Sequence, residues 1–348
     1  MSDANAVPMS APAPAPATVP TSVPLPTADL RPGPIDVHAH WLPRDLFALP
    51  PGAPFGGITD RDGRMFIGDT PLSIDTRLMS DVDAIRADME EKGVGARVLS
   101  APPFAFALGT AAGTEEYVAS FNGELARVVT DGAGWFAGFG CVSLADPDAA
   151  SRQLGELAAT PGILGVAIPP LLGAGSLDAE PLEGVLRRAT ELGLAVLVHP
   201  MQLPSPTLAK HYLVNLIGNP VETATAIASV LLGGVLERIP ELRICFVHGG
   251  GCAPDLLGRW SHAWHARPDV SAGSSTPPEQ GFRSLWLDTV THDTDAFDLL
   301  AAKAGEGRVL LGSDYPFDMA DPDPVVHAVE RGLTREQLEQ DARVFLRL

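Results

Sequence analysis

The chain has 348 residues, of which 43 are acidic and 24 are basic, giving a formal net charge of −19 at pH 7. Such an acidic protein repels the phosphates of nucleic acids and the headgroups of anionic lipids, so we expect neither a nucleic acid nor a membrane partner. Hydrophobic residues make up 45% of the sequence and charged residues 19%, which predicts a globular protein with a large core.

The cysteines and the apolar runs favour a cytoplasmic protein. Cys141, Cys245 and Cys252 are few and odd in number, as is typical of thiols in a reducing compartment. No apolar run approaches the roughly 18 residues that a membrane-spanning helix needs. We therefore expect a cytoplasmic location.

The first 34 residues differ in composition from the rest of the chain. Residues 1–34 are rich in proline and alanine and lack both the cationic start and the unbroken apolar stretch of a signal peptide. Proline removes helix hydrogen bonds, and small side chains bury too little surface to offset chain entropy. This composition predicts a disordered tail over 1–34, followed by one domain over 35–348.

Beyond the tail, short apolar runs alternate with amphipathic segments, as β-strands and α-helices do in a parallel sheet. Eight runs are predicted to be strands, at 34–40, 96–102, 135–144, 163–169, 194–200, 243–250, 284–290 and 308–317. Helical patterns lie between them, for example at 80–92 and 180–193. Residues 41–79 are too long and too rich in Gly and Pro for an ordinary connection, which predicts an insertion over the barrel mouth after the first strand.

Eight strands alternating with helices favour a closed (β/α)₈ barrel of the TIM type, although a doubly wound open sheet has the same alternation. The polar residues favour the barrel, because barrel enzymes carry their chemistry at the carboxyl ends of the strands. Five imidazole or carboxylate side chains lie at such ends, namely His38, His40, His199, His248 and Asp314.

The first predicted strand ends in "DVHAH", which places His38 and His40 two residues apart. Side chains alternate along a strand, so both imidazoles point to one side, about 6–7 Å apart, and can reach one ion. His199 and Asp314 complete a set of three imidazoles and one carboxylate. Zinc prefers such ligands and keeps one position open in catalytic sites. We therefore predict one Zn²⁺ per chain.

His248, in "VHGGG", follows the sixth predicted strand and is compatible with three roles: a fifth ligand, a general base or a structural histidine. We favour acid–base catalysis, because an imidazole readily exchanges protons near neutral pH. His292 follows the seventh strand, and we expect it to face the substrate, to contact a residue of the metal site, or to be structural. Asp288 on the same strand is expected to orient His292 or to cap the next helix. The remaining histidines lie in helical patterns and are expected at the surface or in packing contacts: His211, His262, His265 and His327.

Several segments together resemble the amidohydrolase-related, metal-dependent decarboxylases, and most closely the aminocarboxymuconate semialdehyde decarboxylases. The resemblance rests on "IDVHAHWLP", "HP", "AKHYLVNLIGNPVETATAIASVLLGGVLERIPELRICFVHGGG", "GRWSHAWHARPD" and "LLGSDYPF". It covers about 35–348 and is densest from 194 to 317. It implies an amidohydrolase-type (β/α)₈ barrel and a non-oxidative decarboxylation with a metal ion, usually zinc, and no organic cofactor.

Position by position, the resemblance implies four metal ligands: His38, His40, His199 and Asp314. It makes His248 the acid–base residue, and Asp314 then belongs to the catalytic machinery as well. Arg267, in "ARPD", is implied to bind the substrate carboxylate. In the resembling enzymes the equivalent arginine reaches into the neighbouring subunit's site, so the resemblance implies a homodimer with Arg267 acting in trans.

Two positions depart from the family pattern. Ile67 stands where the family has an arginine that helps to hold a carboxylate, and Met201 directly follows "HP", where the family has a tryptophan. Arg64 and Arg77 are candidate substitutes for the missing arginine, and we predict Arg77 and His292 as further substrate-binding residues. These departures leave the metal chemistry intact but leave the exact substrate open.

The sequence therefore predicts a zinc-dependent decarboxylase that acts on a small unsaturated or aromatic carboxylic acid. The alternative keeps the metal but changes the reaction to hydrolysis of a lactone or amide, or to hydration of a double bond, by the same metal-activated water. A non-catalytic metal-binding module is a third hypothesis. It is disfavoured because structural zinc sites are typically closed and often built from cysteines.

Overall fold

A computed structural model describes residues 28–47, 57–67, 70–110, 112–202 and 205–348. Most of the predicted tail, 1–27, lies outside the described residues. Residues 28–34, which composition assigned to the tail, contact the folded domain: Leu30 is only 5% exposed, and the backbone N–H of Gly33 donates to the Glu339 carboxylate over 2.8 Å. The folded part therefore begins before residue 34.

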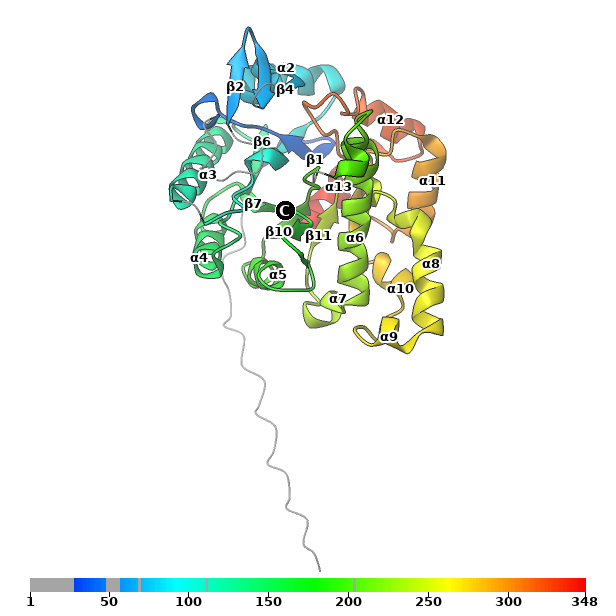
Figure 1. Ribbon diagram of the computed structural model, residues 1–348. Helices are drawn as coiled ribbons and strands as arrows, with labels where there is room; N and C mark the ends of the chain where they lie inside the picture. Colours follow the sequence, from blue (N-terminus) through cyan, green and yellow to red (C-terminus); the bar gives the residue numbers. More distant parts are fainter. Residues whose placement is uncertain (1–27, 48–56, 68–69, 111, 203–204) are drawn as a thin grey trace, which may run out of the picture.

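The core is an eight-stranded parallel sheet in which each strand pairs with the next along the chain (Figure 1). Its strands are β1 (Ile35–His40), β5 (Ala96–Ser100), β6 (Phe136–Gly140), β7 (Ile163–Ile168), β10 (Ala195–Val198), β11 (Ile244–Phe246), β12 (Trp286–Asp288) and β13 (Val309–Leu310). All eight predicted strands are thus present, although several are shorter than the apolar runs that predicted them.

The sheet closes on itself because the chain directly after β13 pairs with β1. The backbone N–H of Val37 donates to the Leu311 carbonyl, and the N–H of Asp314 donates to the His38 carbonyl, each over 2.9 Å. Ala39 also forms a parallel bridge with Tyr315. The predicted (β/α)₈ barrel is therefore confirmed, and the doubly wound open sheet is excluded.

Helices surround the barrel (Figure 1). They are α1 (Thr76–Ser80), α2 (Val82–Lys92), α3 (Thr114–Asp131), α4 (Pro147–Ala158), α5 (Leu182–Glu191), α6 (Asn219–Leu232), α7 (Val235–Arg238), α8 (Ala253–Ala266), α9 (Pro268–Ser271), α10 (Pro278–Phe282), α11 (Thr294–Lys303), α12 (Pro324–Glu330) and α13 (Arg335–Leu346). The helices predicted at 80–92 and 180–193 correspond to α2 and α5. No helix among the described residues is long and apolar enough to cross a membrane.

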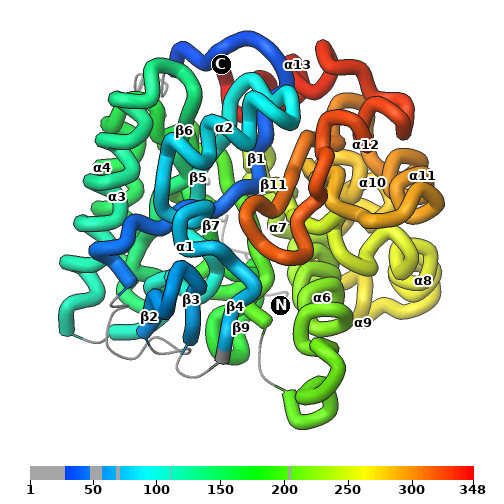
Figure 2. Tube along the Cα trace, turned by 90° about the horizontal axis from the view of Figure 1, so that it is seen from above, coloured from blue at the N-terminus to red at the C-terminus, as the bar shows by residue number. Residues whose placement is uncertain are grey.

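The segment 41–79 carries its own secondary structure. Strands β2 (Ile58–Arg61), β3 (Arg64–Ile67) and β4 (Thr70–Asp75) form an antiparallel sheet, and Figure 2 shows this sheet beside α1. The Tyr315 hydroxyl donates to the Leu78 carbonyl over 2.9 Å. Helix α1 therefore touches the loop that follows β13. A second, two-stranded ribbon, β8 (Leu171–Leu172) with β9 (Gly175–Ser176), lies after β7.

Candidate metal centre and its cavity

The four predicted ligands meet at the carboxyl end of the barrel. His38 and His40 lie on β1, His199 directly follows β10, and Asp314 follows β13. All four side chains are buried, and one ligand atom from each lies within 4.8 Å of the others. These residues form a metal-binding site, so the predicted convergence of the ligands from three strand ends is confirmed.

Each imidazole is held through Nδ1, which leaves Nε2 to face the centre. The Nδ1 of His38 lies 2.6 Å from Asp288 Oδ2. The Nδ1 of His40 lies 3.3 Å from the Ala101 carbonyl, and that of His199 lies 2.7 Å from the Pro200 carbonyl. Such partners fix the tautomer and the ring orientation of metal-binding histidines.

The atoms that face the centre lie around one carboxylate oxygen, and only Nε2 of His40 makes a hydrogen bond to it among the three histidine ligands. Oδ1 of Asp314 lies 3.1 Å from Nε2 of His38, 3.1 Å from that of His40 and 3.7 Å from that of His199. Although these atoms are close, Nε2 of His38 and of His199 is buried without a hydrogen bond in the described part of the chain. Buried polar atoms are rarely left unsatisfied. A metal ion at the centre would satisfy both nitrogens.

The protonation states also suit a metal ion. Burial lowers the pKa of His40 and holds that of His199 well below its usual range, so both rings are neutral and able to bind. Burial raises the pKa of Asp314, but the charge of His38 and the hydrogen bond from His248 outweigh it and hold this pKa well below its usual range. The carboxylate therefore stays ionised.

His38 differs from the other two histidine ligands. Burial lowers its pKa, but the carboxylates of Asp314 and Asp288 outweigh that effect and raise the pKa to about 10. In the metal-free site His38 is therefore protonated at neutral pH. Because only the deprotonated ring nitrogen binds a metal, an incoming cation must displace this proton.

Asp288 has a different role from the one predicted. We expected it to orient His292 or to cap a helix, but Oδ2 lies against His38 and Oδ1 accepts the backbone N–H of Gly249 over 2.8 Å. The aspartate thus joins β12 to the first metal ligand and to the turn that follows β11. The sequence separation of 250 residues between His38 and Asp288 explains why no local pattern indicated this pair.

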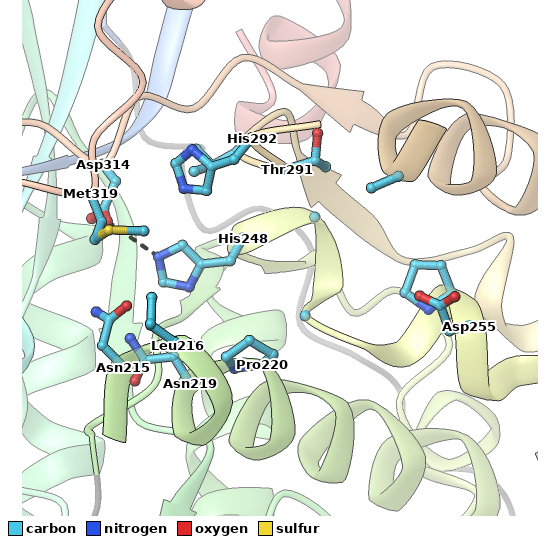
Figure 3. A pocket seen from close by; sticks show the side chains of 15 residues that line it. Asn215, Leu216, Asn219, Pro220, His248, Asp255, Thr291, His292, Asp314 and Met319 are labelled. Carbon is cyan, nitrogen blue, oxygen red and sulfur yellow. Dashed lines mark hydrogen bonds and ion pairs between the residues drawn. The ribbon is translucent and has the colours of Figure 1, made fainter. Parts of the chain in front are cut away.

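A cavity of about 250 Å³ opens onto the metal site (Figure 3). It is lined by Asn215, Leu216, Asn219, Pro220, His248, Gly249, Gly251, Pro254, Asp255, Val290, Thr291, His292, Ala296, Asp314 and Met319. Nε2 of His248 lies 3.3 Å from Asp314 Oδ2, so the predicted acid–base residue contacts a metal ligand. The structure therefore brings His248, His292 and Asp314 to one cavity.

Three side chains of this cavity come from strained backbone. His248, His292 and Asp314 have φ values of 56°, 57° and 60°, in the left-handed region that residues other than glycine seldom adopt. Each such conformation costs about 1–3 kcal/mol and is found mostly at functional sites. The glycines after His248 allow close packing, since a Cβ on Gly251 would lie 2.3 Å from the Pro220 carbonyl. The turn therefore holds His248 against the start of α6.

Two predicted substrate-binding arginines lie outside the described lining of this cavity. Arg267 ends α8, and its side chain is 63% exposed and pairs with Asp269 over 2.7 Å. Arg77 lies on the exposed side of α1, whereas Thr76 and Met79 on the other side are buried. The structure does not bring Arg77 into the site of its own chain, because the burial of α1 turns this side chain outward.

The remaining candidates also have defined positions. Arg64 is exposed and Ile67 half-buried on β3, whereas Met201 is buried directly after His199 and Pro200. Among the histidines expected outside the site, three are exposed on the surface: His211, His262 and His265. His327 is half-buried and lies 2.6 Å from Asp321. None of these residues lines the cavity within the described part of the chain.

Sequence reasoning missed the uncharged side chains of the cavity. Asn215, Asn219 and Met319 line it with the histidines, but asparagines and methionines are common at surfaces and in cores and carry no signal of their own. The signal that was available is the spacing of the two asparagines, which lie four residues apart in the π-helical turn Val214–Gly218 and at the start of α6. Residues at this spacing share one face of a helix.

The comparisons with known proteins agree with this geometry. The sequence matches the amidohydrolase family over residues 35–343. A 2-amino-3-carboxymuconate-6-semialdehyde decarboxylase from Dictyostelium discoideum is 29% identical over 297 residues, covering 82% of each chain.

Solved structures share the fold at lower identity. A 5-carboxyvanillate decarboxylase from Sphingomonas paucimobilis has a TM-score of 0.76 at 22% identity, covering 92% of this chain and 100% of that one. A dihydroxybenzoic acid decarboxylase from Polaromonas sp. JS666 was solved with bound manganese and the inhibitor 2-nitroresorcinol. It has a TM-score of 0.70 at 19% identity, covering 91% of this chain and 97% of that one. With its closed barrel, its buried ligand cluster and a family match across nearly the whole domain, the chain belongs to the amidohydrolase family.

Proposed function

We propose that this protein is a zinc-dependent, non-oxidative decarboxylase of a small unsaturated or aromatic carboxylic acid. The observation that carries the proposal is the buried ligand cluster of three histidines and Asp314, which opens onto a cavity beside His248. The three relatives named above are decarboxylases: one is named for an unsaturated acid, and the other two are named for aromatic acids. They support this reaction over hydrolysis or hydration.

The metal would be held by His38, His40, His199 and Asp314. We propose zinc because a set of three imidazoles and one carboxylate suits it, although one solved relative contains manganese. When bound, the ion supplies a Lewis acid that draws electron density from the substrate. The donor set fits, because two buried Nε2 atoms make no hydrogen bond among the described residues.

His248 would supply the proton that decarboxylation consumes. Protonation of the carboxyl-bearing carbon makes that carbon tetrahedral. The bond to the carboxylate then breaks, its electron pair returns to the π system, and CO₂ leaves. One carboxylate and one proton are consumed, and one C–H bond and one molecule of CO₂ are formed. Asp314, 3.3 Å from His248 Nε2, orients the ring for this transfer, and His292 lies on the same cavity to contact the substrate.

We further propose that Arg267 binds the substrate carboxylate of the neighbouring subunit in a cytoplasmic homodimer. The exposed position of Arg267 at the end of α8 is compatible with a contact outside its own chain. A guanidinium offers a rigid fork for a carboxylate, and no arginine or lysine lines the described part of the cavity in its own chain. The three cysteines are free, which supports a reducing compartment.

Subunit exchange tests the trans role of Arg267. An inactive Arg267→Ala chain is mixed with an inactive His248→Ala chain until mixed dimers form. If the arginine acts in trans, both lesions fall into one site of each mixed dimer, the other site is intact, and activity returns. No recovery after verified exchange places Arg267 in cis or outside catalysis.

The reaction itself is tested by CO₂ release from ¹³C-carboxyl-labelled unsaturated and phenolic acids, using zinc-loaded protein and the His248→Ala variant as a matched control. We expect labelled CO₂ with at least one acid from the wild type and at least about 10²-fold less from the variant. Turnover of lactones, amides or double bonds without CO₂ would establish the hydrolase or hydratase alternative instead.

A further inference from the structure

Asn219 lies at the first residue of a helix, one position after the one from which an asparagine usually caps the backbone. It is the first residue of α6, directly after a single π-helical turn at Val214–Gly218. Asparagine is favoured just before a helix because its side chain caps free N–H groups. Gly218 takes the capping position instead, and no side chain caps this helix. The amide of Asn219 therefore has no capping role.

The amide is nevertheless buried. Asn219 is 5% exposed, and its Oδ1 has no hydrogen-bond partner among the described residues. Leaving a buried amide oxygen unpaired is unfavourable, so such an atom calls for a specific explanation. Figure 3 shows Asn219 with Asn215 and Leu216 below His248 on the cavity that serves the metal site. A ligand in that cavity is within reach of the unpaired oxygen.

The charges around the cavity define what such a ligand offers. Its described lining contains two carboxylates, Asp255 and Asp314, and no lysine or arginine. When bound, the metal ion would attract the acidic group of a ligand, as would the proposed Arg267 of the neighbouring subunit. The described lining of this chain offers no lysine or arginine beside Asn219 for a second anionic group. An uncharged group with a hydrogen to donate is the complementary partner of an amide oxygen.

We propose that Asn219 determines specificity by accepting a hydrogen bond from a hydroxyl or amino substituent of the substrate. This inference rests on the proposed function for the identity of the site, and it adds a residue that distinguishes substrates by their substituents. Asn215 lines the same cavity one turn earlier, yet it is only half-buried, and none of its atoms is buried without a partner. Asn215 therefore serves as a matched control on the same wall.

The test measures binding of compounds that carry no carboxylate and release no CO₂. The probes are nitrobenzene and its derivatives with one hydroxyl, amino or methoxy group at position 2, 3 or 4, titrated by calorimetry into zinc-loaded protein. We expect the wild type to bind the hydroxyl or amino derivative at one position about tenfold more tightly than both nitrobenzene and the methoxy derivative, the value of one hydrogen bond. In Asn219→Leu and Asn219→Ala this ratio falls to about threefold or less, while the affinity for nitrobenzene is retained.

The control variant Asn215→Leu is expected to keep the wild-type ratio, and metal content is checked in every variant. Because a ratio of two affinities is compared within each protein, a general loss of stability does not imitate the expected result. An unchanged ratio in both Asn219 variants overturns the proposal, as does a wild type that shows no preference at any position. Failure of the decarboxylase assay leaves this measurement intact, since no reaction takes place in it.

Discussion

Two buried clusters of polar side chains begin on β1, and they differ in how the atoms without a hydrogen bond are arranged. Around Asp36, Oδ2 accepts hydrogen bonds from Arg97 Nε over 2.8 Å and from the Ser313 hydroxyl over 2.6 Å. Oδ1 accepts the backbone N–H groups of His38 and Ser313, each over 3.1 Å. The Arg97 guanidinium lies 4.3 Å from the centre of the Tyr315 ring. Both carboxylate oxygens are therefore satisfied from within the chain.

The metal cluster begins two residues further along the same strand, and the chain leaves it incomplete. His38 and His199 each keep a buried Nε2 without a hydrogen bond among the described residues. The Asp36 cluster joins β1, β5 and the chain after β13 and so helps to close the barrel. In the Asp36 cluster, Nη1 of Arg97 is likewise buried without a hydrogen bond among the described residues, but the unpaired Nε2 atoms of the metal cluster lie around one carboxylate oxygen. Unpaired buried atoms that converge on one point call for a ligand.

The largest expected effect comes from Asp314→Ala. Removing one of four ligands and the only carboxylate leaves a set too small for tight binding, so we expect less than about a tenth of the wild-type metal content and no detectable turnover. Elemental analysis of the purified protein gives the metal content. Asp255→Ala, which removes a carboxylate from the same cavity, is expected to keep its metal. Full metal content in Asp314→Ala would contradict the ligand assignment.

The next largest effect is expected for His248→Ala. This variant should retain its metal but lose about 10²–10⁴-fold in kcat, the usual contribution of a positioned acid–base group. Metal content and kcat are measured on the same preparation. A metal-free His248→Ala protein would show that His248 is a ligand, and the division between ligands and acid–base residue would then be wrong.

Breaking the cluster around Asp36 should reduce the stability of the protein. Arg97→Met leaves the buried Asp36 carboxylate without its cation, so we expect the free energy of unfolding in urea to fall by about 3–5 kcal/mol. The control is Arg127→Met, because Arg127 is 60% exposed and pairs with Glu124 on the surface. That variant should lose less than about 1 kcal/mol. Equal losses in the two variants would remove the distinction between the buried and the exposed pair.

A smaller effect is expected for Asp288→Asn. The amide can still contact His38 Nδ1, but it removes the negative charge that raises the basicity of the ring, so metal affinity should fall by about 10–100-fold. Competition with a chelator of known affinity measures this change. Unchanged affinity would mean that Asp288 supports only the turn at Gly249.

The sequence predicted the barrel from local periodicity, and it predicted the four ligands from their positions at strand ends, which a barrel brings together. Apolar runs identify the strands, and the alternation along "DVHAH" aims His38 and His40 to one side, as the structure confirms. Contacts between distant segments were beyond this reasoning. The pairing of Asp288 with His38 joins β12 to β1, and the outward turn of Arg77 depends on how α1 packs. The unpaired oxygen of Asn219 is visible only once the burial of each atom is known.

A crystal structure of the zinc-loaded protein, with anomalous diffraction recorded on both sides of the zinc absorption edge, tests directly whether the four ligands bind one zinc ion. We expect one anomalous peak per chain, about 2.0–2.2 Å from Nε2 of each of His38, His40 and His199 and from a carboxylate oxygen of Asp314. A peak bound by other residues, or no peak at this cluster in zinc-loaded crystals, would contradict the ligand assignment.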